Sequence, residues 1–265
     1  RAARRIYHDV MSEWYDAEDE RSTQLKFHTQ TAGQSLTAQQ PLNNIVRVTI
    51  QALAGVLGGT QSLHTNSFDE ALALPSEEAV TVALRTQQII AEESGAADVI
   101  DPLGGSYFVE TLTDEIEAEA MAYIEEIREM GDGSVRDGVL AGIDEGYYHR
   151  EISEASYEYQ SRVEDGEEVV VGVNKYDTEG DTRPDLLHVE DEVQDRQLAR
   201  LESVKDDRDD AAVEAALSDL RETVRDGDNV MPVLVDAVKE YVTMGEIMDV
   251  FAEEYGTYRE TIGVM

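Results

Sequence analysis

The chain has 265 residues, of which 58 are Asp or Glu and 21 are Lys or Arg, so its formal net charge is -37. This excess of acid argues against nucleic acid as a partner, because phosphate binding needs basic patches. The chain contains no cysteine, which excludes disulfides and thiolate-bound metals. It also contains no run of about 18 apolar residues that would predict a membrane span.

The net charge also indicates the solvent in which the protein folds. Self-repulsion among so many carboxylates strains a compact fold in dilute buffer, whereas at molar salt the Debye length falls to about 3 Å. We therefore expect a protein of a salt-rich cytoplasm, as in halophilic archaea. The alternative is an acidic disordered protein, which the 41% of hydrophobic residues and their regular spacing disfavour.

The first part of the chain alternates between strand-like and helix-like patterns. A helix is predicted over residues 3–17, and strands over residues 25–29 and 60–65, each followed by a polar loop. The helix between the strands carries an apolar stripe that we expect to pack on them, formed by Val46, Ile50, Leu53 and Leu57. Strand, polar loop and helix, repeated twice, predict a parallel α/β fold whose site lies at the loops after the strands.

The remainder of the chain is predicted to be mainly helical. Ser76 is a suitable N-cap for a helix that ends near residue 93. Residues 168–173 are rich in β-formers without alternation, which predicts a buried strand, and residues 186–189 predict a last short strand. Further helices are expected over residues 116–127, 135–145, 152–163, 190–220, 233–242 and 247–255.

Two polar clusters near the strands could carry chemistry. Lys26, His28 and Gln30 share one face of the first strand, and a His beside a carboxamide could bind an anionic or carbonyl oxygen. A core His bonded to a backbone group is the structural alternative. Glu70 and its neighbour Asp69 start a helical turn, where either acid could simply favour the helix dipole.

Several long motifs resemble one known family, in the same order and over nearly the whole chain. They read FHTQTAG, SLTAQ, PLNN, GTQSLHTN and DEALALP, then IDPLGGSY, VVVGVNKY and the closing TIGVM. These are similar to motifs of the cobalamin-dependent acyl-CoA mutases of the methylmalonyl-CoA mutase type. The resemblance implies that residues 1–100 form the last two βα units of a (β/α)8 TIM barrel. Residues 101–265 would form a mostly helical region with one or two short strands that wraps the barrel.

The resemblance also assigns roles to individual residues. Matching positions bind the acyl-CoA substrate at Lys26, His28, Gln30 and Gln61. Other matching positions bind adenosylcobalamin at Gly33, Glu70 and Ala73. The glycine could equally be an ordinary turn residue. No residue here matches the family's catalytic Tyr and His, which lie outside this stretch, and no metal site is expected.

The implied function is the radical interconversion of methylmalonyl-CoA and succinyl-CoA. The chain would be the C-terminal half of a large catalytic subunit, inactive alone. Its partners would be the N-terminal barrel half and a separate cobalamin-binding small subunit, within an oligomer. Two alternatives stay open. One is a related mutase for isobutyryl-CoA or 2-hydroxyisobutyryl-CoA. Gln34 stands where methylmalonyl-CoA mutases often have Trp, which leaves room for a related mutase or for an archaeal variant of the same one. The other is a non-catalytic acidic assembly partner.

Overall fold

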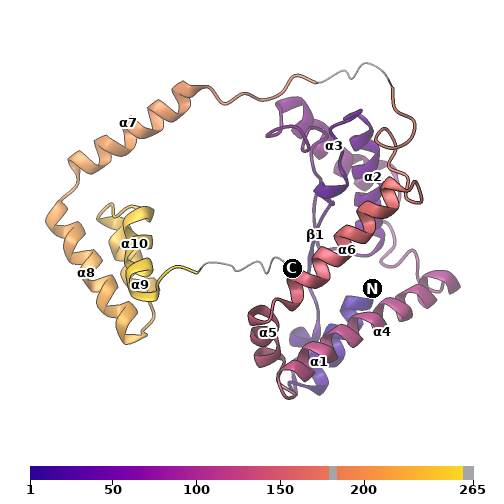
Figure 1. Ribbon diagram of the computed structural model, residues 1–265, viewed down its shortest axis with the longest axis horizontal. Helices are drawn as coiled ribbons and strands as arrows, with labels where there is room; N and C mark the ends of the chain where they lie inside the picture. The colour runs from indigo at the N-terminus through magenta and orange to yellow at the C-terminus, as the bar shows by residue number, and fades with distance from the viewer. Residues whose placement is uncertain (179–183, 259–265) are drawn as a thin grey trace. The chain divides into compact units, whose positions relative to one another are not determined.

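The computed structural model describes residues 1–178 and 184–258 (Figure 1). The chain divides into two compact units, Arg1–Leu187 and His188–Met265. The boundary predicted near residue 100 stays a prediction. The closing TIGVM motif lies outside the described residues. No helix in the part of the chain that the structure describes is long and apolar enough to cross a membrane.

The first unit contains two short parallel strands joined by a helix. Strand β1 spans His28–Gln30 and β2 spans Ser62–His64, and their register pairs His28 with Ser62 and Gln30 with His64. Helix α2, Asn43–Leu57, makes the crossover between them. The α/β class with a parallel pair is therefore confirmed, although both strands are shorter than predicted. The eight-stranded barrel stays a prediction.

Helix α2 presents a different face to the strands from the one predicted. Val48 and Ala52 are buried, and Gly55 lies so close to the sheet that a Cβ there would be 3.2 Å from the Thr29 methyl group. Val46 and Ile50 instead remain 58% and 64% exposed, so the predicted stripe was wrong. The reason is that α2 is apolar on both faces, so its periodicity could not choose between them.

Three further elements complete the surroundings of the strands. Helix α1 spans Ala2–Glu13, shorter than predicted, and a 3-10 turn spans Glu20–Thr23. Another 3-10 turn, Gly33–Ser35, follows β1. Helix α3 spans Glu77–Glu93, and the Ser76 hydroxyl accepts a hydrogen bond from the Ala79 amide, as the predicted N-cap requires.

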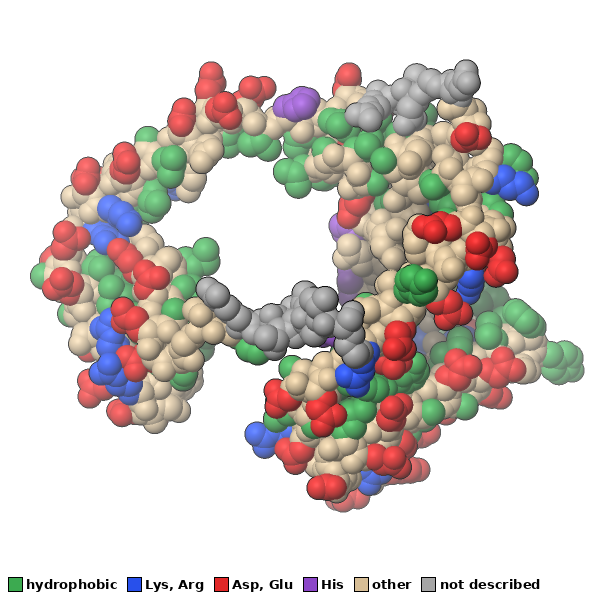
Figure 2. Space-filling model, viewed as in Figure 1, with side chains coloured by type: hydrophobic (Ala, Val, Ile, Leu, Met, Phe, Trp, Pro, Cys, Tyr) green, Lys and Arg blue, Asp and Glu red, His purple; other side chains and the backbone are tan. Residues whose placement is uncertain are grey.

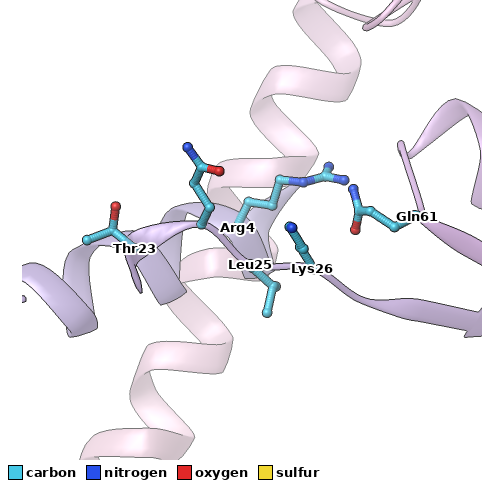
Figure 3. A pocket seen from close by; sticks show the side chains of 6 residues that line it. Arg4, Thr23, Leu25, Lys26 and Gln61 are labelled. Carbon is cyan, nitrogen blue, oxygen red and sulfur yellow. The ribbon is translucent and has the colours of Figure 1, made fainter. Parts of the chain in front are cut away.

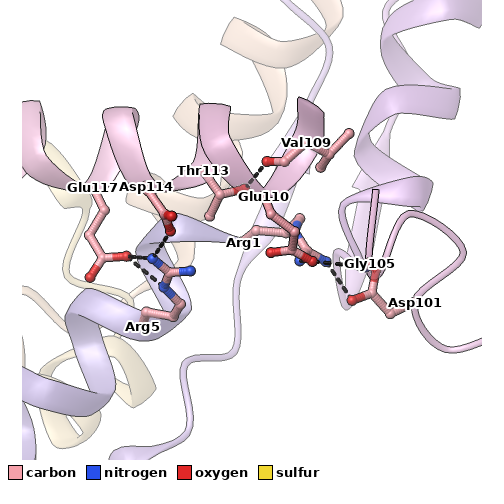
Figure 4. A network of polar contacts seen from close by, with 9 residues as sticks. All are labelled: Arg1, Arg5, Asp101, Gly105, Val109, Glu110, Thr113, Asp114 and Glu117. Atoms are coloured by element: carbon pink, nitrogen blue, oxygen red, sulfur yellow. Dashed lines mark hydrogen bonds and ion pairs between the residues drawn. The ribbon is translucent and has the colours of Figure 1, made fainter. Parts of the chain in front are cut away.

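Helix α4, Tyr107–Met130, packs against α1 through ion pairs (Figure 4). These pairs tie the start of the chain to the turn before α4 and to its first three turns. Surface ion pairs contribute little each, so the network chiefly fixes how the two helices meet. Its members are Arg1 with Asp101 and Glu110, and Arg5 with Asp114 and Glu117.

Helices α5, Val135–Asp144, and α6, Tyr147–Glu164, follow in the same unit. The α4–α5 contact is close because Gly138 has no side chain. A Cβ at Gly138 would lie 1.8 Å from the Ile127 carbonyl oxygen, so only glycine fits there. Figure 2 shows acidic side chains spread over the helices, with far fewer Lys and Arg.

The two strands predicted late in the chain are absent from the described residues. Residues 168–173 form turns with one isolated bridge between Val171 and Lys175, and Val169, Val171 and Val173 are each about two-fifths exposed. Residues 186–189 have no regular structure. Both predictions were wrong because β-rich composition forms a strand only where a sheet edge is available to pair with it.

The second unit is helical. Helix α7 spans Asp191–Asp207, α8 Asp210–Asp226, α9 Met231–Lys239 and α10 Met244–Tyr255. Helix α8 packs against both α9 and α10. Two apolar clusters hold this bundle together, and their fully or nearly fully buried members are Val213, Ala237 and Val242, and Leu220, Val224 and Val250.

Candidate functional site

The exposed face of the two strands gathers the residues predicted to bind substrate. Lys26, His28 and Gln30 are exposed, whereas Phe27 and Thr29 between them are half-buried. This alternation confirms that the three polar side chains share one face of the strand segment. Because β2 is parallel to β1, its exposed polar residues extend the same face.

His28 has a side-chain partner on the neighbouring strand. Its Nδ1 lies 2.6 Å from the Ser62 hydroxyl. The imidazole is exposed, so it is not the core His of the structural alternative. Ser62 orients the ring, while the imidazole's other nitrogen stays available to a ligand. Sequence reasoning missed Ser62, and only the strand register could have found it.

Gln61 plays a structural part at the start of β2. Its Oε1 accepts a hydrogen bond from the Phe27 amide at 2.8 Å, and its Nε2 donates to the Gly59 carbonyl at 3.1 Å. The side chain therefore ties the beginnings of the two strands together. Its part in substrate binding stays a prediction.

Gln61 and Lys26 also line a cavity of about 380 Å³ near the amino ends of the strands (Figure 3). Arg4 lies in the same cavity. Its guanidinium donates to the Gly58 carbonyl at 2.9 Å and stands 4.9 Å from the centre of the Phe27 ring. Two cations in one cavity of so acidic a chain make a local environment that suits an anionic group.

Beyond the carboxyl ends of the strands, two buried residues join the loops. The Thr31 hydroxyl donates to Asn66 Oδ1 at 2.5 Å and accepts a hydrogen bond from the Asn66 amide at 2.9 Å. The two residues are only 3% and 2% exposed. This pair holds the loop after β1 against the loop after β2, in the place where α/β folds bind ligands.

Two of the residues predicted to bind the cofactor come together there. A Cβ on Gly33 would lie 3.1 Å from Asn66 Nδ2 and 3.2 Å from Glu70 Oε1. Gly33 thus gives the backbone a close approach to both side chains. Glycine at this position leaves open a surface that any larger residue would fill.

Asp69 and Glu70 have different surroundings. Asp69 is fully buried, and its Oδ2 accepts a hydrogen bond from the Ser76 amide at 2.9 Å, just before α3. Asp69 is therefore the structural acid of the pair. Glu70 is exposed and faces Gly33. Ala73 closes the turn, since its amide donates to the Asp69 carbonyl at 3.1 Å.

Three buried polar atoms in the loop after β2 have no hydrogen-bond partner among the described residues. They are Asn66 Nδ2, Ser67 Oγ and Asp69 Oδ1. Leaving a buried polar group unpaired costs about 1–3 kcal/mol. A ligand or bound water beside this loop would supply the missing hydrogen bonds.

A second cavity, of about 320 Å³, opens beside this loop. Its polar lining contains His64, Ser67, Glu70 and Gln87, and its apolar lining includes Val80 and Leu84. A polar rim on an apolar wall is typical of sites for small organic ligands. Among the described residues no group of His, Asp and Glu is arranged to hold a metal ion.

The whole region is electrically neutral, unlike the rest of the chain. Residues 25–76 contain two acids, Asp69 and Glu70, and two bases, Lys26 and Arg47. The net charge of -37 therefore lies entirely outside this stretch. A neutral surface lets an anionic ligand approach without the repulsion that the acidic helices would impose.

A comparison with known protein families shows the family of this chain. The family model described as methylmalonyl-CoA mutase matches residues 1–257. The chain belongs to this family. The prediction made from the motifs is therefore confirmed.

Individual members of the methylmalonyl-CoA mutase family match along almost the whole chain. The 2-hydroxyisobutanoyl-CoA mutase large subunit of Aquincola tertiaricarbonis is 44% identical over 98% of this chain and 46% of its own length. The methylmalonyl-CoA mutases of Escherichia coli and Homo sapiens are 43% and 42% identical over 97% and 98% of this chain. The chain spans 35% and 34% of those two proteins.

The residues predicted to bind substrate or cofactor lie at three levels along the two strands. Lys26 and Gln61 lie at the amino-end cavity, His28 and Gln30 on the exposed strand face, and Gly33 with Glu70 past the carboxyl ends. Ala73 sits in the turn behind Glu70. The roles of all seven stay predictions. Thr31 and Asn66, to which the motifs assigned no role, are the buried residues that fix the third level.

Proposed function

We propose that this chain forms part of the substrate and cofactor pocket of an adenosylcobalamin-dependent acyl-CoA mutase. The reaction would interconvert methylmalonyl-CoA and succinyl-CoA, as the names of two relatives suggest. The observation that carries the proposal is the convergence of Gly33, Asn66 and Glu70 beyond two parallel strands. Family membership supplies the reaction class.

The residues at this level fit the expected cofactor. Gly33 leaves a cradle that a Cβ would fill, and Asn66 Nδ2 is a buried donor without a partner in the described chain. Glu70 would accept hydrogen bonds from the ribose hydroxyls of the adenosyl group. When bound, adenosylcobalamin supplies the radical that takes hydrogen from the acyl-CoA.

The strand face would position the substrate. His28, held by Ser62, would donate a hydrogen bond to a carbonyl or carboxylate oxygen of the acyl group, and Gln30 lies next to it on the same face. Lys26 at the amino-end cavity would hold an anionic part of CoA. These contacts orient the acyl-CoA, and the surrounding protein excludes water from a reactive radical.

A second substrate has specific support. The 44%-identical relative is named a 2-hydroxyisobutanoyl-CoA mutase large subunit. Gln34, exposed in the 3-10 turn after β1, also differs from the Trp that the resemblance associates with many methylmalonyl-CoA mutases. Turnover of 2-hydroxyisobutyryl-CoA or isobutyryl-CoA in place of methylmalonyl-CoA would decide for this alternative.

The test is a reconstituted enzyme. The chain would be combined with the N-terminal barrel half, a cobalamin-binding subunit and adenosylcobalamin, and thioester products measured by chromatography. Glu70→Ala should weaken cofactor affinity or rate about tenfold to a hundredfold, since a hydrogen bond to a charged acceptor is worth roughly 1.5–3 kcal/mol. Glu77→Ala, an exposed acid in the first turn of α3, is the matched control. Equal kinetics for both variants would contradict the role of Glu70.

The chain by itself should be inactive in the same assay, even with cofactor and substrate present. Two parallel strands leave unpaired backbone groups at both edges, and the apolar outer face of α2 remains exposed. Omitting each component in turn would show which are required. Turnover by residues 1–265 alone would show that the pocket is built differently from the one proposed.

A further inference from the structure

Helix α7 is a 17-residue helix that makes no extended packing contact with any other element among the described residues. It leads into α8 without lying along the bundle of α8, α9 and α10 (Figure 1). Most helices in proteins owe their stability to the packing of an apolar face rather than to helix propensity. A partner for α7 is therefore expected.

Helix α7 is amphipathic. Val193, Leu198 and Leu201 are 44%, 50% and 39% exposed, and together with Val204 they form one apolar stripe. Two cations of the helix, Arg196 and Arg200, lie along one edge of this stripe, Lys205 lies within it, and several of the acids lie on the opposite face. None of these three cations has a hydrogen-bond or ion-pair partner among the described residues.

Helix α4 carries the complementary pattern. Leu112, Ile116 and Tyr123 are 41%, 50% and 51% exposed on one face of this helix. Glu115 and Glu119, both exposed, run beside that stripe at a spacing of four residues. Arg196 and Arg200 on α7 have the same spacing, so an acid pair and a base pair can face each other while the apolar stripes meet.

We infer that α4 of one copy of this chain docks on α7 of a second copy. Both stripes are present on every copy, so the pairing can be reciprocal, with each α7 on the other copy's α4. Such a two-fold arrangement closes on itself and covers both stripes twice. The inference does not depend on the proposed mutase reaction.

Charge exchange tests the pairing. The whole 265-residue chain would be studied by sedimentation equilibrium at the lowest salt that preserves its circular dichroism, because exposed charges are screened at high salt. The Arg196→Glu, Arg200→Glu double variant should raise the dimer dissociation constant at least about tenfold. The Glu115→Arg, Glu119→Arg variant should do the same. The variant that combines both double substitutions, and so exchanges the charges at all four positions, should bring the dimer dissociation constant back to within about threefold of the parent value.

The matched control reverses two exposed cations elsewhere, Arg85 and Arg136, to Glu. This variant should dimerise like the parent chain. Failure of the four-residue exchange to restore dimerisation, with both double variants folded, would overturn the inference. So would a parent chain that stays monomeric at tens of micromolar.

The absence of cysteine allows a second test that separates copies. Leu112→Cys chains mixed with Leu201→Cys chains should form a disulfide between copies under mild oxidation. Leu140→Cys, exposed on α5, should not pair with Leu201→Cys. If α7 instead closes on α4 of its own chain, the mixed single variants will not cross-link, and the proposed docking between copies is wrong.

Discussion

Residues 25–76, which contain both strands and the proposed site, differ in charge from residues 208–256, which contain the bundle of α8, α9 and α10. The first region holds two acids and two bases, for a net charge of zero. The second holds 13 acids and four bases, for a net charge of -9. Their interiors differ as well. The site region buries a network of polar groups, whereas the bundle buries two apolar clusters.

The difference separates the demands of function from those of stability. Buried polar atoms without partners, such as Asn66 Nδ2, destabilise the site region, and a bound ligand would relieve that cost under the proposed function. Among the described residues the bundle has one such atom, Arg208 Nε, which lies 3.5 Å from Asp210 Oδ1. The bundle owes its stability to apolar burial and to charge pairs at its surface, such as Arg221 with Glu253. Salt should therefore affect the two regions unequally.

The largest expected effect is that of salt on the whole fold. Lowering salt from molar to about 0.1 M raises the Debye length to about 10 Å, so the carboxylates begin to repel one another. We predict cooperative loss of the helical circular dichroism signal. Hydrogen exchange should show peptides from residues 208–256 losing protection before peptides from residues 25–76.

An uncharged osmolyte at equal osmolarity is the control for salt, since it does not screen charge. Unchanged spectra and melting temperature across the salt range would contradict the halophilic interpretation. Simultaneous loss of protection in both regions would contradict the comparison between them.

Leu220→Ala should give the largest effect of a single substitution. Leu220 on α8 is fully buried in an apolar cluster with Val224 and Val250. Removing it should destabilise the bundle by roughly 3–5 kcal/mol through lost burial and the cavity left behind. Urea unfolding at molar salt measures this change. Met244→Ala, at a position 80% exposed, should change stability little, and equal losses in the two variants would argue against the cluster as the core.

Thr31→Val tests the polar interior of the site region in the same way. The substitution keeps the shape but removes the hydroxyl that bonds both Asn66 Oδ1 and the Asn66 amide. Two buried groups lose their partner, so a loss of about 2–3 kcal/mol is expected. Thr81→Val, whose hydroxyl is exposed on α3, is the control. A stable Thr31→Val variant would mean that water replaces the hydroxyl.

The sequence predicted the elements whose signals are local. Ser76 as an N-cap and the alternation of Lys26, His28 and Gln30 depend on neighbouring residues only, and both are confirmed. The face of α2 could not be predicted, because Val46 and Val48 are equally apolar and only the position of the sheet distinguishes them. The strand predicted over residues 168–173 was wrong for the same reason, because a strand needs a free sheet edge to pair with.

The candidate site shows the same limit. Motif resemblance pointed to Gly33 and Glu70, and the structure brings them together. Thr31 and Asn66 were visible in the polar loops, but nothing in the sequence indicated that these two would be buried and bonded across 35 residues. Contacts between distant loops depend on strand register, which a single sequence does not specify.

The smallest expected effect is a pH-dependent one at the bundle's main charge pair. Arg208 Nη2 donates to Glu246 Oε1 at 2.6 Å, and the Thr243 amide donates to Glu246 Oε2 at 2.8 Å. The hydrogen bond from Arg208, more than the backbone bond from Thr243, lowers the pKa of Glu246 to about 2. Because the folded state lowers this pKa, the stabilisation is fully present above the unfolded value near 4.5 and is lost as pH falls toward 2.

Glu246→Gln should therefore destabilise the bundle by about 1–2 kcal/mol at pH 7, allowing for the partial exposure of the pair. The difference from the parent chain should shrink steadily between pH 5 and about pH 2.5, where the parent carboxylate is itself protonated in the unfolded state. Urea midpoints of both chains at matched salt, taken at each pH, give the difference directly. Glu240→Gln, which replaces an exposed acid at the end of α9, is the matched control for the loss of one carboxylate. A Glu246→Gln deficit that is constant with pH would mean that the side chain acts through its shape and its bond to Thr243 rather than through its charge.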